Sequence, residues 1–179
     1  DVETDDNVLK QTTARLPWLL IGMIGGIGNS MILGNFDATF AAHPEMALYI
    51  PLIGGTGGNV GTQSSAIIVQ GLANSSLDTK NTFKQITKEA VVALINATII
   101  SLLVYTYNFI RFGAKATVTY SVSISLFAVV MFASIFGTLV PMTLEKLKID
   151  PAIATGPFIA ITNDIIGMML YMGITVLLS

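Results

Sequence analysis

Long uncharged segments separate the formal charges of this chain, and this pattern limits the folds that the chain can adopt. Four uncharged runs cover residues 16–36, 46–77, 90–110 and 116–144, and a fifth stretch, 151–179, carries a single charge. Each reaches the roughly 20 residues that an α-helix needs to cross a bilayer. With 53% hydrophobic and 11% charged residues, the composition excludes an ordinary soluble domain. The sequence therefore predicts an all-α membrane protein with five transmembrane helices.

Basic residues are distributed unequally between the two sides of this predicted membrane domain. One side holds only Arg111 and Lys115, and the other holds Lys10, Arg15, Lys80, Lys84, Lys88, Lys146 and Lys148. Loops rich in Lys and Arg remain in the cytosol. We therefore expect a multi-pass protein of the cell membrane (inner or plasma membrane), surrounded by membrane lipid, with a cytosolic N-terminus and an external C-terminus.

One carboxylate interrupts the last apolar stretch. Residues 151–163 and 165–179 carry no charge, and Asp164 lies between them. In a helix that starts at Asp150–Pro151, Asp164 would lie roughly 20 Å from the helix start, near the middle of a hydrocarbon core about 30 Å thick. Placing a charge there costs roughly 2.5–3.5 kcal/mol, so we interpret Asp164 as functional. The alternative is a protonated Asp164 bonded to a neighbouring helix.

Small residues share the predicted helical face of Asp164. They lie one and two turns before it and one turn after it: Gly156, Pro157, Ala160 and Gly167. Such a stripe approaches another backbone closely or lines a narrow water-filled path, and we expect Gly156, Pro157 and Gly167 to line the pore. Because Pro157 has no N–H, the carbonyl of Ile153 would lack its helical donor and could act as a cation ligand.

A second segment combines five glycines with two carboxamides inside an uncharged run. Within residues 51–63, Asn59 and Gln63 are four positions apart and share a helical face with Gly55. This face offers oxygen ligands and close backbone approach without adding charge. We therefore expect Gly58, Asn59 and Gln63 to line a pathway. The alternative is ordinary hydrogen bonding between helices, worth about 0.6 kcal/mol per contact.

Two motifs carry a resemblance to a known family. The first consists of Pro51, Gly57, Gly58, Asn59, Gly61 and Gln63, and the second of Asp150, Pro151, Ala152, Gly156, Pro157, Phe158, Asp164 and Gly167. Together with Arg15-Leu16-Pro17-Trp18 at the start of the first predicted helix, they resemble the membrane domain of the MgtE-type magnesium channel family. The resemblance covers essentially the whole chain.

This resemblance implies a homodimer with a central cation path between the second and fifth helices of both subunits. Asp164 matches the magnesium-binding pore residue of the family, Ala160 a position whose backbone lines that site, and Asn59 the Asn beside it. The family also places magnesium near the start of the fifth helix, which makes Asp150 a candidate for the cytosolic mouth.

The resemblance also implies a domain organisation. Family members usually carry cytosolic magnesium-sensing domains before the membrane part, joined to it by a gating helix. We therefore expect residues 1–14 to be the end of this connecting helix and residues 15–179 to form the five-helix pore domain.

The predicted function is magnesium transport through a dimeric, channel-like pore in which Asp164 binds a largely hydrated Mg²⁺, with Mn²⁺ and Co²⁺ as further candidate ions. The alternative is a proton- or sodium-coupled secondary transporter that uses Asp164 as its coupling site. The chain has no cysteine, one histidine and no Tyr-Asp or Gly-x-Gly-Asp motif of an intramembrane aspartyl protease. We therefore expect no enzyme, and we find no patch that indicates a nucleic-acid partner.

Overall fold

Five long helices make up most of the described chain. The computed structural model describes residues 2–77, 79–152 and 156–179. The long helices are α1 (Val8–Gly34), α3 (Ile50–Ala73), α4 (Thr82–Phe112), α5 (Thr117–Lys146) and α6 (Pro157–Leu178). Short helical segments connect them: α2 (Asp37–Ala42), η1 (Pro44–Tyr49) and η2 (Thr79–Asn81). The prediction of an all-α fold is confirmed.

Four of these helices have both the length and the hydropathy of a membrane span: α1, α4, α5 and α6. The 24 residues of α3 are also long enough, at about 1.5 Å per residue, to cross a hydrocarbon core. Its glycines and carboxamides lower its hydropathy, so α3 differs from the other four in composition rather than in length.

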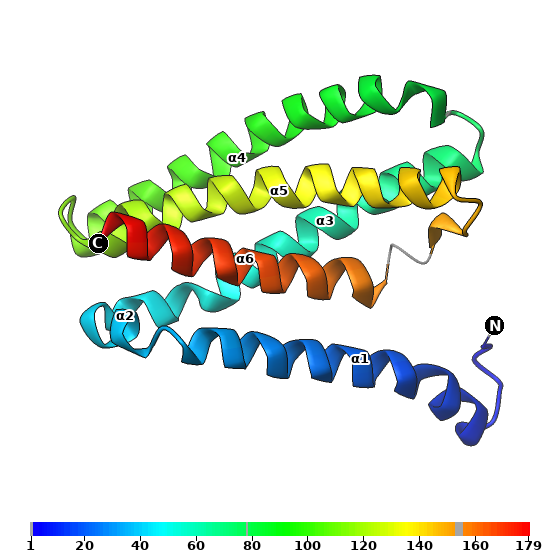
Figure 1. Cartoon of the computed structure of the whole chain (residues 1–179), viewed down its shortest axis with the longest axis horizontal. Helices are drawn as coiled ribbons and strands as arrows, with labels where there is room; N and C mark the ends of the chain where they lie inside the picture. The colour runs from blue at the N-terminus through cyan, green and yellow to red at the C-terminus, as the bar shows by residue number, and fades with distance from the viewer. Residues whose placement is uncertain (1, 78, 153–155) are drawn as a thin grey trace.

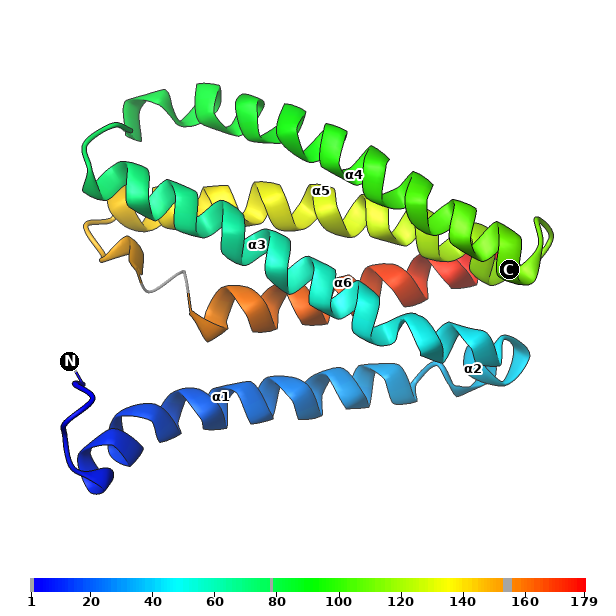
Figure 2. The ribbon, with the colours of Figure 1, turned by 180° about the vertical axis from the view of Figure 1, so that it is seen from behind.

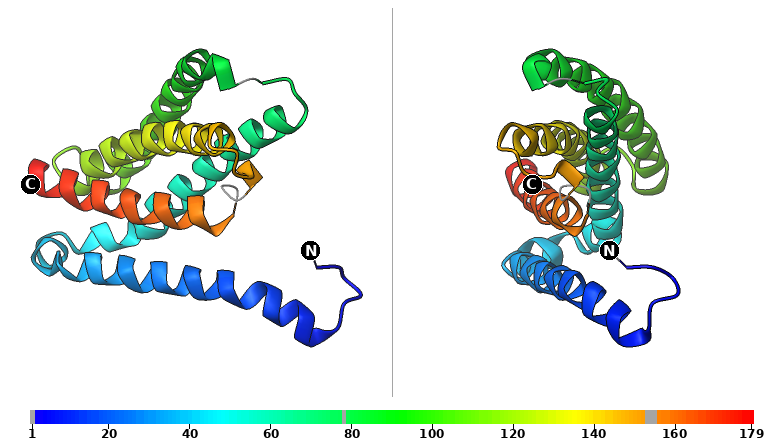
Figure 3. Two further views of the ribbon diagram at one scale, coloured as in Figure 1. Left: turned by 45° about the vertical axis from the view of Figure 1, so that its right-hand side comes forward. Right: turned by 90° about the vertical axis from the view of Figure 1, so that its right-hand side faces the viewer.

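The helices form a layer that α3 crosses. In Figure 1, α1, α6, α5 and α4 follow one another from bottom to top, and α3 runs diagonally behind them. Figure 2 shows α3 in front, where it packs against both α5 and α6. The helix α1 packs chiefly against α6, and the views of Figure 3 show it at the edge of the molecule. The two chain ends lie at opposite ends of the bundle (Figure 1).

The helix α5 is the centre of the packing. Of its 30 residues, 15 are buried, whereas none of the most apolar window of α1 is buried. An apolar cluster joins α5 to η1, α3 and α6 and includes Val118, Val122, Leu126, Val129, Met46, Ile53, Met168, Tyr171 and Met172. Buried hydroxyls add polar links, such as the 2.5 Å hydrogen bond between Ser121 and Thr175. Association between helices in a membrane depends on such packing and hydrogen bonding, because lipid tails are as apolar as the helices.

Glycines allow α3 to contact α5 and α6 at the same level. A Cβ atom added at Gly137 of α5 would lie 2.6 Å from the carbonyl oxygen of Gly61 in α3. A Cβ atom added at Gly61 would overlap the side-chain amide of Asn163 in α6. Small residues at these positions are therefore a steric requirement of the three-helix contact.

Two predicted helix boundaries are wrong. The last helix begins at Pro157 rather than Pro151, because Pro157 fixes its own φ at the first helical position and Gly156 before it is extended (φ −99°, ψ −151°). The helix α4 begins at Thr82, eight residues before the uncharged run 90–110 that marks the third predicted span. The Ile153 carbonyl lies outside the described residues.

The contact between Gly61 and Gly137 predicts a large stability difference between two glycine variants. Gly137→Ala should lower the free energy of unfolding by about 1–3 kcal/mol, because the added methyl group meets a backbone carbonyl that cannot turn away. Gly22→Ala is the matched control, because nothing lies within 4 Å of a Cβ atom there; it should stabilise the protein slightly or leave it unchanged. Thermal unfolding in detergent, followed by circular dichroism, measures both. Equal melting temperatures would contradict the steric argument.

Candidate functional site

The side chain of Asp164 extends from α6 toward α1 and α3. It lies seven residues after Pro157, roughly 10 Å along the helix. Its Oδ2 atom accepts a 3.5 Å hydrogen bond from Nδ2 of Asn29 in α1. Its Oδ1 atom occupies the space that a Cβ atom would need at Gly54 in α3. Three helices therefore position this one partly buried carboxylate.

The carboxylate opens into a groove between α3 and α6. The groove has a volume of about 340 Å³ and is lined by Gly54, Gly55, Gly58, Asn59, Thr62, Ala160, Ile161 and Asp164. Three glycines form most of the α3 wall, so backbone rather than bulky side chains faces the carboxylate. Four of the residues predicted from the sequence are brought together here: Gly58, Asn59, Ala160 and Asp164.

The other predicted residues lie outside this groove. Gln63 is exposed on α3, one turn beyond Asn59, and Gly156 and Pro157 form the start of α6. Gly167 is buried, and a Cβ atom there would contact Val129 and Ile53 in the scaffold. Asp150 lies before α6, where its Oδ1 atom accepts a 3.0 Å hydrogen bond from the backbone N–H of Ala152. That bond closes a local turn of the type that Asp commonly makes.

A polar face of α3 extends beyond the groove. Gly55, Asn59 and Gln63 are all exposed and follow one another at intervals of four residues, so they share one side of the helix. Amide groups at membrane depth need hydrogen-bonding partners, because lipid supplies none. This face therefore requires a protein or water-filled surface opposite it.

Two buried asparagines, one bonded to Asp164 and one beside it in α6, were given no role from the sequence. Asn29 is buried and bonds Asp164 although 135 positions separate them. Asn163 is 1% exposed and fits against Gly61; neither its Nδ2 nor its Oδ1 has a hydrogen-bond partner among the described residues. Each of them is a single Asn within an apolar run of the sequence. Such a residue indicates a polar contact in the folded protein, but the sequence does not show which residue it contacts.

One copy of the chain supplies little charge to the groove. Within the described residues, no group of three or more His, Cys, Asp and Glu side chains could hold a metal ion. The ion pair that the described part contains, between Lys10 and Asp6, lies near the N-terminus and away from Asp164. A cation in the groove would therefore meet one carboxylate, the Asn59 carboxamide and backbone oxygens.

These features define a multi-pass membrane protein with a carboxylate in an open polar groove, as expected of an ion transporter. Residues 50–174 match the MgtE family, whose members are divalent cation transporters. The chain belongs to this family, which confirms the resemblance inferred from the two motifs, and it is accordingly a transporter-family protein rather than an enzyme.

Curated relatives agree with the family assignment. The chain is 32% identical over 174 residues to the magnesium transporter MgtE of Bacillus subtilis, which covers 97% of this chain and 38% of that protein. It is 32% identical over 165 residues to the magnesium transporter MgtE of Thermus thermophilus, covering 92% and 36%. The corresponding protein of Enterococcus faecalis is 29% identical over 172 residues, covering 96% and 38%. The chain thus spans little more than a third of the length of these relatives.

Because Asp164 packs against Gly54, ion transport should be sensitive to any side chain added at position 54. Gly54→Ala should displace the carboxylate, because the added methyl group would occupy the place of Oδ1. We expect divalent-cation flux into proteoliposomes to fall about tenfold, equivalent to about 1.4 kcal/mol. Gly26→Ala in α1, where nothing lies within 4 Å of a Cβ atom, is the control and should retain the flux. If both variants transport equally well, the carboxylate position is not important for transport.

Proposed function

We propose that this chain transports Mg²⁺ across the cell membrane through a pore that two copies form together, with α3 and α6 of each copy lining it. The observation that carries this proposal is the Asp164 carboxylate in a groove whose α3 wall consists mostly of glycine backbone. A charge that is costly to insert lies where a cation from the pore can reach it. Membership of a family of divalent cation transporters supports the same function.

The exposed polar face of α3 supports the proposal of a second copy. Gly55, Asn59 and Gln63 would face the same residues of the partner subunit across the pore, so that water and ion replace lipid beside their polar groups. Two-fold symmetry is the commonest arrangement of a homo-oligomer. It would bring two Asp164 carboxylates toward one ion, and their two negative charges would balance the charge of Mg²⁺.

The ion would bind largely hydrated. Mg²⁺ loses its water reluctantly and usually keeps several of its six ligands as water. The groove has a volume of about 340 Å³, whereas one water needs only about 10–15 Å³ of such space, so a hydration shell fits. At a carboxylate–ion distance of about 4.5 Å and an effective dielectric constant near 20, the attraction is about 7 kcal/mol before desolvation. Contacts through water would leave the ion mobile, as conduction requires. Mn²⁺ and Co²⁺ are further candidate ions.

The unequal distribution of basic residues supports a cytosolic N-terminus and an external C-terminus. The start of α6 would then lie toward the cytosol, with Gly156 and Pro157 near the inner end of the path. Asp150, which precedes them, would lie at its cytosolic mouth.

The helix α1 offers a route by which a preceding cytosolic segment could act on the pore. It begins at Val8 and continues without a break to Gly34, so residues 8–14 belong to the same helix as the first span. Two contacts join α1 to the groove: Gly25 lies against Ile161, and Asn29 bonds Asp164. We propose that residues 1–14 end a connecting helix from magnesium-sensing domains of the same protein, and that movement of α1 would reach Asp164 through these contacts.

The proposal predicts that charge, and not only shape, is required at position 164. Asp164→Asn keeps the size of the side chain and removes its negative charge, so Mg²⁺ influx should fall to background. Asp37→Asn, in the exposed helix α2, is the matched control and should transport normally. Influx into proteoliposomes is measured with a magnesium-sensitive dye, and size-exclusion chromatography confirms that both variants are folded. Normal influx through a folded Asn variant would overturn the proposed role.

The same assay separates the channel from a secondary transporter. A channel predicts influx that follows the Mg²⁺ gradient and the membrane potential whether or not a proton or sodium gradient is present. Influx that requires one of those gradients would contradict the channel proposal and favour coupling through Asp164.

A further inference from the structure

A second carboxylate lies within the helical bundle, on α4. Glu89 immediately precedes the uncharged run 90–110 and is partly buried. Its Oε1 atom accepts a 2.6 Å hydrogen bond from the hydroxyl of Ser64 in α3. Ser64 lies roughly 20 Å from the start of α3 and about 14 Å before its end, so this bond is made at membrane depth and not in a loop. An ionisable side chain at this depth is costly, and its partner indicates what it does.

Ser64 is the partner that the structure provides for this carboxylate. In the described part of the chain, no lysine or arginine forms an ion pair with Glu89. Ser64 is 5% exposed, so its hydroxyl has little access to water. The distance of 2.6 Å is typical of a hydroxyl that donates to an ionised carboxylate, and such bonds are about twice as strong as bonds between neutral groups. Each group therefore compensates for the hydration that the other has lost.

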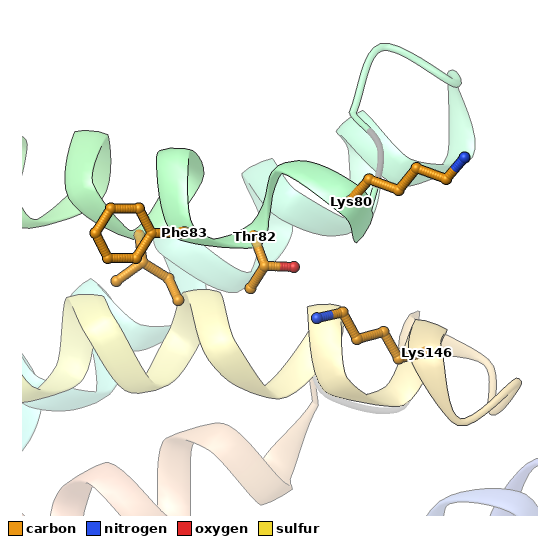
Figure 4. A pocket seen from close by; sticks show the side chains of 5 residues that line it. Lys80, Thr82, Phe83 and Lys146 are labelled. Atoms are coloured by element: carbon orange, nitrogen blue, oxygen red, sulfur yellow. The ribbon is translucent and has the colours of Figure 1, made fainter.

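Close to this bond, α4 lies apart from α5. Figures 1 and 2 show the two helices diverging toward the end of the bundle where α4 begins. A pocket of about 560 Å³ separates the start of α4 from the end of α5 (Figure 4), and it is lined by Lys80, Thr82, Phe83, Ile86 and Lys146. The bond between Ser64 and Glu89 is the side-chain hydrogen bond that the described residues form between α3 and α4. It therefore joins α4 to α3 at the end of the bundle where α4 has separated from α5.

Ser64 lies on the side of α3 opposite the groove. It follows Gly55, which lines the groove, by nine residues, or about two and a half helical turns. Its Cβ atom lies 3.2 Å from the place that a Cβ atom would take at Gly137 in α5. The bond to Glu89 thus acts on the buried side of α3. It opposes a rotation of α3 about its own axis, which would turn Gly55 away from Asp164.

We propose that Glu89 is a positioning residue of the ion pathway. By holding Ser64, its carboxylate fixes the rotation of α3 and keeps the glycine wall of the groove opposite Asp164. Glu89 does not line the groove, so it acts on the ion only through α3. This inference rests on the proposed transport of Mg²⁺ past Asp164. The role of Glu89 is that of a hydrogen-bond acceptor, so an uncharged acceptor of the same shape should replace it.

Magnesium influx into proteoliposomes, with variants at both ends of the bond, tests this role. Glu89→Ala and Ser64→Ala each remove the bond and should lower influx at least about tenfold, the effect expected from one hydrogen bond to a charged group. The double variant should be no more impaired than either single variant, because both changes remove the same bond. Glu89→Gln keeps an acceptor for the Ser64 hydroxyl and should transport nearly as well as the unaltered chain.

Two control variants remove similar groups that lack this bond. Ser65→Ala removes a neighbouring buried hydroxyl that has no hydrogen-bond partner among the described residues, and Glu145→Ala removes an exposed carboxylate near the end of α5. Both should transport normally. Equal losses in Ser64→Ala and Ser65→Ala, a roughly hundredfold loss in the double variant, or a loss in Glu89→Gln as large as in Glu89→Ala would each overturn the proposal. If Glu89→Ala does not fold, Ser64→Ala and Glu89→Gln still decide between these outcomes.

Asp164→Asn, measured in the same assay, separates this inference from the proposed function. If the unaltered chain carries no Mg²⁺, or if Asp164→Asn carries as much as the unaltered chain, the proposed function itself fails. If the unaltered chain transports and Asp164→Asn does not, normal influx through Glu89→Ala and Ser64→Ala overturns only the role of Glu89.

Discussion

The fit of the Asp164 carboxylate against the bare backbone of Gly54 is the contact on which the site depends. A membrane span can hold a carboxylate only where other groups compensate for lost hydration. Here Gly54 leaves room for Oδ1, and Asn29 donates a hydrogen bond to Oδ2. The same lack of side chains at Gly55 and Gly58 keeps the groove open beside the carboxylate. Glycine in α3 thus serves both the placement of the charge and access to it.

The scaffold behind the groove holds this geometry. The buried helix α5 supports α3 through the contact of Gly137 with Gly61, and Gly61 in turn receives the side chain of Asn163 from α6. At the opposite end of the bundle, Tyr49 of η1 donates a hydrogen bond to Asn108 of α4, and Tyr171 of α6 donates one of 2.8 Å to the carbonyl of Met46. These bonds tie the segment just before α3 to α4 and to α6, so they hold the N-terminal end of α3 in place.

The groove is predictable from the sequence because its residues obey local rules. Glycine density and amide spacing mark Gly58 and Asn59 in α3. An isolated charge marks Asp164 in α6, and small residues on the same face mark Ala160. Each signal is therefore visible within a single helix. Gly167 shares the predicted face of Asp164 but packs against Val129 and Ile53 in the scaffold. Helical spacing shows which residues lie on one face of a helix, but it does not show what that face packs against. The start of α6 is harder to predict because Asp150–Pro151 and Gly156–Pro157 are both favourable helix starts. The bond between Asn29 and Asp164 has no local signal, because it joins residues 135 positions apart.

The central claim is that two copies of the chain hold one hydrated ion between their Asp164 carboxylates. Crystals soaked in Mn²⁺ test it directly, because the anomalous signal of manganese locates the ion independently of the protein density. We predict one peak on the two-fold axis between the α3–α6 grooves, separated from each carboxylate by a water shell, at about 4–5 Å rather than the roughly 2 Å of direct coordination. A dimer with no peak between the two Asp164 side chains, or with α3 and α6 facing lipid, would contradict this account.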